Sequence, residues 1–181
     1  AVQHATQKRM PVVLGVPFDL QKQDFSGDFS NLKGTFKFPK LDDVHPKDNA
    51  IQSVAALLQN TEKTIIFAGM GATSDYARKL IVELADVTGS LLATTLPAKG
   101  LFHDQTFCLG VAGGYASDAT KDIFARAEVV LGIGARMASH TFDGGRLTPK
   151  AKVIQIDLEP QEQVQGRRAS DVQITSDAIS G

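Results

Sequence analysis

The sequence predicts an α/β protein with a doubly wound, Rossmann-like parallel sheet of about six strands. Short apolar runs, such as residues 64–68 and 129–133, alternate with stretches in which apolar side chains recur every three or four positions. The runs are apolar at every position, so both faces of each strand are expected to be covered. Fully apolar strands separated by amphipathic helices are typical of a parallel sheet with helices on both sides.

The first 45 residues do not follow this alternation. Residues 1–9 are expected to form the last turns of a helix, and residues 11–17 are an apolar run bounded by prolines, which predicts a short buried strand. Between residues 18 and 48 glycine, asparagine and proline occur without periodicity, over a stretch longer than most connections within a domain. We therefore expect a separate N-terminal segment at 1–21, a linker at 22–45 and the Rossmann-like domain at 46–181.

The elements of the second region follow in order. Ile51, Val54 and Leu58 share one face of a helix, and residues 64–68 form the first strand. A second helix extends from Tyr76 and stops at a glycine, Gly89. The remaining expected elements are strands at 91–95, 107–109, 129–133, 153–157 and 171–175, and a helix at 116–127 with Ser117 near its N-cap.

Composition excludes several classes of function. Lys and Arg total 19 against 20 Asp and Glu, a net charge of −1, which argues against a partner that is a nucleic acid. The apolar runs are far shorter than the ~20 residues of a membrane span, so no membrane partner is expected. Cys108 is the single cysteine, so no disulfide can form within the chain, which fits a cytoplasmic location.

Ligands of doubly wound sheets bind outside the carboxyl ends of the strands. Gly69 and Gly71 follow the first strand, where glycines allow backbone N–H groups to approach a phosphate at a helix start. The dinucleotide fingerprint requires a third glycine, where this chain has Ser74, and an acidic residue after the second strand, where it has Thr94 and Thr95. These departures argue against an ordinary NAD dehydrogenase.

The later strand ends carry a cation and an anion. Gly134, Ala135 and Arg136 follow the strand at 129–133, and Asp157 ends the strand at 153–157. A nucleotide diphosphate would suit this combination. Two alternatives stay open: glycines after strands serve tight turns in any α/β fold, and an arginine pairs with a neighbouring carboxylate as readily as with a phosphate.

No catalytic residue and no metal ligand is predicted. The chain has neither a Gly-x-Ser-x-Gly nucleophile motif nor a P-loop, and Cys108 stands in an apolar context typical of a core residue. The histidines do not show metal-ligand spacing with other ligating residues; they are His4, His45, His103 and His140.

Five runs occur in series: residues 67–71, 93–102, 109–111, 131–136 and 153–160. Together they resemble the central domain of thiamine diphosphate-dependent enzymes, the group of acetolactate synthase, pyruvate oxidase and benzoylformate decarboxylase. Residues 9–21 likewise resemble the end of that family's N-terminal pyrimidine-binding domain, which implies that residues 1–21 are the C-terminal remnant of such a domain.

The resemblance implies a larger parent enzyme, a homodimer or homotetramer that binds thiamine diphosphate and Mg²⁺ between its pyrimidine and pyrophosphate domains. Such a parent acts on 2-oxo acids by decarboxylation and carboligation, as a lyase or transferase. This chain alone is then expected to bind neither thiamine diphosphate nor Mg²⁺ and to have no activity.

The resemblance also implies a nucleotide crevice, since central domains of this family hold FAD, hold ADP or serve as empty scaffolds. The contacts would fall on Gly69, Gly71, Thr94, Thr95, Leu96, Gly134, Ala135, Arg136, Asp157 and Asp177. Residues 137–140 differ from the acidic, arginine-rich continuation of the acetolactate synthases, which argues against FAD. The alternative functions are an independent flavin- or NAD-binding oxidoreductase domain and a pure subunit-interaction module.

Overall fold

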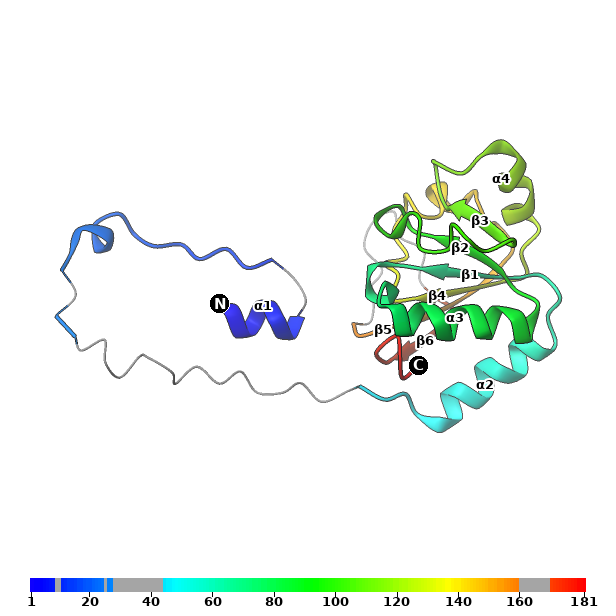
Figure 1. The fold of residues 1–181 in the computed structure, drawn as a ribbon, viewed down its shortest axis with the longest axis horizontal. Coiled ribbons are helices and arrows are strands. Elements are labelled where there is room, and N and C mark those ends of the chain that lie inside the picture. The colour runs from blue at the N-terminus through cyan, green and yellow to red at the C-terminus, as the bar shows by residue number, and fades with distance from the viewer. Residues whose placement is uncertain (9–10, 25, 28–43, 160–169) are drawn as a thin grey trace. The chain divides into compact units, whose positions relative to one another are not determined.

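A computed structural model describes residues 1–8, 11–24, 26–27, 44–159 and 170–181 (Figure 1). The chain divides into two compact units, residues 1–42 and 43–181. Most of the expected linker lies outside the described residues, so the division into a remnant at 1–21 and a linker at 22–45 stays a prediction.

The first unit contains helix α1 (Val2–Lys8) and a short 3₁₀ turn, η1 (Leu20–Lys22). The buried strand predicted at 11–17 is wrong: these residues form no strand, and the side chain of Val13 is 95% exposed. A strand needs a neighbouring strand to accept and donate its backbone hydrogen bonds, and the described residues of this unit offer none.

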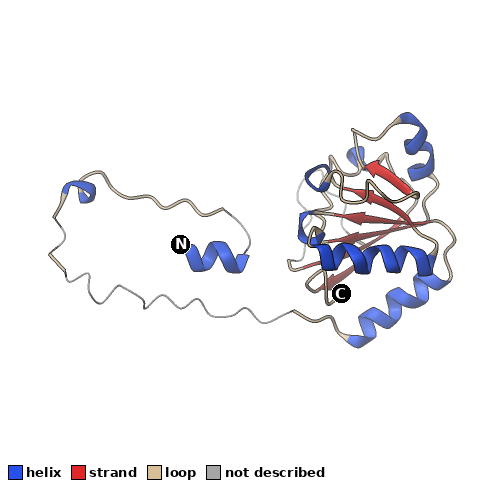
Figure 2. Cartoon of the chain, viewed as in Figure 1, coloured by secondary structure: helices blue, strands red, loops and turns tan. Residues whose placement is uncertain are grey.

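The second unit is built on a six-stranded parallel sheet in the order β3-β2-β1-β4-β5-β6, which confirms the predicted fold class (Figure 2). The strands are β1 (Thr64–Ala68), β2 (Leu91–Thr94), β3 (Cys108–Val111), β4 (Val129–Ile133), β5 (Lys152–Asp157) and β6 (Val172–Thr175). The chain order reverses between β1 and β4, where such sheets open a crevice for ligands.

In the described parts of this unit, residues 44–159 and 170–181, three α-helices accompany the sheet: α2 (Asp48–Gln59), α3 (Asp75–Thr88) and α4 (Asp118–Ala125). Ser74 caps α3 by accepting the N–H of Ala77, and Gly89 ends it with a φ of 65°. Ser117 caps α4 in the same way, which confirms the predicted start. None of the described helices is long and apolar enough to cross a membrane.

The two faces of the sheet are covered differently. Helices α2 and α3 pack on one face around Ile66, Leu131 and Ile154. Helix α4 covers part of the other, with Phe124 in edge-to-face contact with Phe67. The rest of that face is covered by the β4–β5 connection, residues 134–151, whose only helical element is the 3₁₀ turn η5 (Asp143–Gly145). A buried loop therefore stands where a doubly wound sheet usually has a helix.

Candidate functional site

The glycine turn after β1 meets the start of the 134–151 connection backbone to backbone. A Cβ added to Gly69 would fall against the carbonyl oxygen of Gly134 and the Cα of Ala135, and one added to Gly71 would lie 2.9 Å from the Gly134 Cα. The Gly69 N–H donates to Ile133 O at 3.0 Å and the Gly71 N–H to Gly134 O at 2.9 Å. These glycines permit the contact between two loops, and their N–H groups are already bonded within the protein.

The turn after β2 is also largely internal. Thr94 is 1% exposed, and its buried Oγ1 has no hydrogen-bond partner. The Thr95 N–H donates to Ala68 O at 2.9 Å, which attaches this turn to β1. Of the three predicted contacts in this turn, Thr94, Thr95 and Leu96, only Leu96 is exposed, at 41%, so a ligand could contact it directly.

Arg136 is an exposed cation at the carboxyl ends of the strands, and its backbone is held on both sides. Gly134 has a φ of 53° and donates its N–H to Ile156 O at 2.9 Å. The carbonyl of Arg136 accepts the Ala138 N–H at 2.8 Å and the Thr141 hydroxyl at 3.4 Å. Ala135 is fully buried. Arg136 is thus an exposed residue on a stretch of backbone that these hydrogen bonds hold.

Asp157 ends β5 next to β4 and is half-buried. Burial raises the pKa of its carboxyl above the usual value, and the charge of Glu159 raises it further. Backbone hydrogen bonds from Glu159 and Leu158 and the charge on Arg136 lower this pKa, but they do not cancel the effect of burial. Arg136 and Asp157 follow or end adjacent strands, and the charge of the arginine acts on the pKa of the carboxyl. The two side chains form no ion pair within 4.0 Å in the described structure, so the pairing of this arginine with a carboxylate stays an open alternative.

Asp177 lies beyond Asp157, on the side of the sheet away from the glycine turns. It follows β6 at the edge of the sheet, and its Oδ1 accepts the Ile179 N–H at 3.0 Å. Its own N–H donates to Val44 O at 3.0 Å, and the Ser176 hydroxyl donates to the same oxygen at 2.9 Å. Strand β5 separates β6 from β4, so the structure does not bring Asp177 to the glycine turns.

Gln155 is the residue that the sequence interpretation missed. It is 0% exposed on β5, its Nε2 donates to Ala135 O at 3.1 Å, and its Oε1 has no hydrogen-bond partner. A buried acceptor without a partner costs about 1–3 kcal/mol. The only sequence signal was a single amide within an otherwise apolar strand.

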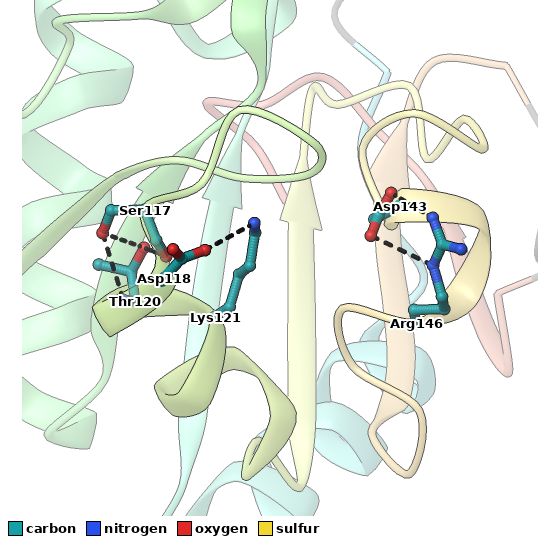
Figure 3. Close-up of polar contacts among 6 residues, drawn as sticks. All are labelled: Ser117, Asp118, Thr120, Lys121, Asp143 and Arg146. Carbon is teal, nitrogen blue, oxygen red and sulfur yellow. Dashed lines mark hydrogen bonds and ion pairs between the residues drawn. The ribbon is translucent and has the colours of Figure 1, made fainter.

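Two further ion pairs lie on α4 and at η5 (Figure 3). Lys121 pairs with Asp118 at 3.1 Å, and Arg146 pairs with Asp143 at 3.0 Å. The hydrogen bond from Arg146, aided by the charges of Arg146 and Lys121, lowers the pKa of Asp143. Both cations are thus engaged by carboxylates of their own elements.

The described residues contain no group of three or more His, Cys, Asp and Glu side chains that could hold a metal ion. The carboxyl ends of the strands therefore present an exposed arginine and, on the adjacent strand, a half-buried carboxylate, in a frame of closely packed glycine turns.

Comparison with known proteins identifies the family. Residues 51–180, more than half of the chain, match the model described as "Thiamine pyrophosphate enzyme, central domain"; thiamine pyrophosphate is another name for thiamine diphosphate.

Similar relatives are acetolactate synthases. The large subunit from Porphyra purpurea is 31% identical over 176 residues, covering 92% of this chain and 28% of the relative. A probable large subunit from Methanocaldococcus jannaschii is 32% identical over 71% of this chain and 22% of the relative, and the Mycobacterium leprae enzyme is 30% identical over 81% and 25%. The chain spans about a quarter of the length of these relatives. It belongs to the thiamine diphosphate enzyme family, as a central domain related to that of acetolactate synthase.

Proposed function

We propose that this chain is the scaffold and nucleotide-binding domain of an acetolactate synthase-like enzyme that uses thiamine diphosphate and Mg²⁺ to act on 2-oxo acids. The family match and the relatives support the parent activity, which belongs to a longer protein than the stretch aligned here. The missing partners are the pyrimidine and pyrophosphate domains of the same enzyme. A homodimeric or homotetrameric parent and a cytoplasmic location remain predictions.

The nucleotide part of the proposal depends on one observation: the exposed Arg136 follows β4, and the half-buried Asp157 ends the adjacent strand β5. A guanidinium recognises phosphate oxygens, and a carboxylate at the end of a strand can accept hydrogen bonds from ribose hydroxyls. The residues therefore fit the ADP moiety that ADP and FAD share. When FAD is bound it supplies redox chemistry in addition.

The glycine turns have a smaller role in this proposal than the sequence suggested. The N–H groups of Gly69, Gly71 and Gly134 donate to backbone carbonyls, so the diphosphate would be held mainly by the Arg136 side chain. Gly69, Gly71, Thr94, Thr95, Leu96, Gly134, Ala135 and Asp177 stay predicted contacts.

The described residues contain no cluster of side chains that could hold Mg²⁺. We propose that other domains of the parent hold both Mg²⁺ and thiamine diphosphate. Calorimetry on this 181-residue chain should then detect no tight binding of thiamine diphosphate with Mg²⁺, and tight binding would contradict the assignment.

The test of the nucleotide site compares Arg136→Gln with a matched control, Arg126→Gln. Arg126 is an exposed arginine at the C-cap of α4, at the opposite end of the sheet. Loss of one charge-assisted contact should weaken ADP and FAD binding about tenfold in Arg136→Gln, equivalent to about 1.4 kcal/mol, and leave Arg126→Gln like the wild type. Equal affinities in all three proteins would contradict the site.

A subunit-interaction module is the second candidate function, and the amino edge of the sheet favours it. A hollow of about 390 Å³ is lined there by residues that include Leu91, Leu92 and Phe107, and Phe107 is 67% exposed. Sedimentation equilibrium should then show a dimer that Phe107→Ser weakens. A monomer with retained nucleotide would exclude this function.

A further inference from the structure

The inference concerns Gln155, which connects β5 to the loop that carries Arg136. Its neighbour Val153 lies in the core on the face shared with α4, and alternation along the strand places Gln155 on that face. Gln155 is paired with Gly132 on β4, so no side chain of β4 stands beside it. From there its Nε2 donates to Ala135 O at 3.1 Å.

This hydrogen bond determines the orientation of the amide. Turning the amide over would bring Oε1 against the carbonyl of Ala135, two acceptors with no hydrogen between them. In the observed orientation Oε1 is buried without a partner. An apolar side chain of similar shape would avoid that penalty, so the donor to Ala135 is the feature that explains an amide at this position.

The bond completes a frame around Arg136. The peptide carbonyl before Arg136 accepts from Gln155, and the carbonyl after it accepts from Ala138 and Thr141. We propose that Gln155 is a positioning residue, which holds the backbone at Ala135 so that Arg136 keeps its place after β4, next to the end of β5 that carries Asp157. The expected effect of Gln155 on nucleotide affinity rests on the proposed function, whereas its effect on the loop that carries Arg136 does not.

Asp157 offers a readout that needs no nucleotide. The charges that act on its carboxyl are those of Arg136, which lowers the pKa, and Glu159, which raises it, while burial raises it. If Arg136 loses its position, the pKa of Asp157 should rise further. A change that only loosens the core would lower stability without this effect.

The experiment uses the whole chain and a double-mutant cycle. The variants are Gln155→Met, Arg136→Gln and their combination, with Ile154→Val as control. Ile154 is the next residue on β5, fully buried on the opposite face. The Asp157 pKa is measured by carboxyl NMR titration, the affinity for ADP by calorimetry and stability by urea unfolding.

We expect Gln155→Met and Arg136→Gln each to raise the Asp157 pKa and to weaken ADP binding about tenfold, with no further change in the double variant. Ile154→Val should lower the urea midpoint alone. Thr141→Val, which removes the other side-chain bond to this loop, should act in the same direction if Gln155→Met does not fold.

An unchanged Asp157 pKa in Gln155→Met, beside a raised one in Arg136→Gln, would overturn the inference. An unchanged pKa in Arg136→Gln would also overturn it, because the charge of Arg136 would then not act on Asp157. If the wild type binds no ADP while the pKa pattern holds, the positioning role is supported and the nucleotide function fails.

Discussion

Gly69→Ala tests whether the glycine turn serves packing. The Gly69 Cβ would have the Gly134 carbonyl carbon at 2.8 Å, and two backbone atoms of Gly134 and Ala135 would be closer still, whereas ordinary contact begins at 3.4 Å. Backbone lines the contact on both sides, so the loops must separate by at least about 0.6 Å. That separation strains the Gly71 N–H bond to Gly134 O, now 2.9 Å long.

The expected loss follows from these contacts. Overpacking costs about 1–3 kcal/mol, and one weakened backbone hydrogen bond adds about 1 kcal/mol. We expect Gly69→Ala to lower the free energy of unfolding by about 3 kcal/mol, or roughly 10 °C in melting temperature.

The assay is urea unfolding followed by circular dichroism. Gly114→Ala is the matched control, since its added Cβ would meet only Asp143 Oδ1, at 3.9 Å. We expect the control to stay within about 0.5 kcal/mol of the wild type. The packing explanation would be refuted if Gly69→Ala changed the free energy of unfolding as little as Gly114→Ala does. A phosphate-binding role would then again be the better explanation for the glycines of this turn.

Two further predictions concern the far edge and the buried carboxyl. Ser176→Ala removes the 2.9 Å hydrogen bond to Val44 O and should lower the free energy of unfolding by about 1 kcal/mol. Hydrogen exchange at the amide of residue 177, which donates to the same oxygen, should become faster. Unchanged exchange would contradict a role of Ser176 in holding the segment before α2. Asp157 has a pKa raised above the usual 3.8 in the folded state. Between pH 3.8 and the raised value the native protein therefore binds more protons than the unfolded chain. The contribution of this carboxyl to stability falls as the pH rises through that interval. Asp157→Asn should therefore be more stable than the wild type at neutral pH but not below pH 3.8, as urea midpoints at the two pH values would show; an equal difference at both would count against a titration effect.

Local sequence signals were sufficient for most of the second unit. The apolar runs became β1, β4 and β5, and the sheet is parallel as predicted. Gly89 and Ser117 mark a helix end and a helix start because their effects depend on backbone conformation and on one nearby N–H. Such features lie within a few residues of one another along the chain.

Other predictions needed partners that sequence patterns do not reveal. The run at 11–17 has a strand's composition and forms no strand, because a strand depends on a neighbouring edge. Gly69 and Gly71 were recognised, but their close partner, Gly134, is more than sixty positions away. The sequence also predicted that the site residues lie at the carboxyl ends of the strands, whereas the separation of Asp177 from the glycine turns followed only from the strand order.

The sequence by itself determined the family, the fold class and the strand ends that carry Arg136 and Asp157, since these follow from short motifs and periodicity. Only the tertiary structure decided which backbone N–H groups are already bonded, which glycines permit loop contact and which buried amide holds the loop of Arg136. The physical reason is that hydrogen-bond partners and close contacts join residues far apart in sequence, and their identity depends on how the strands are ordered in the sheet.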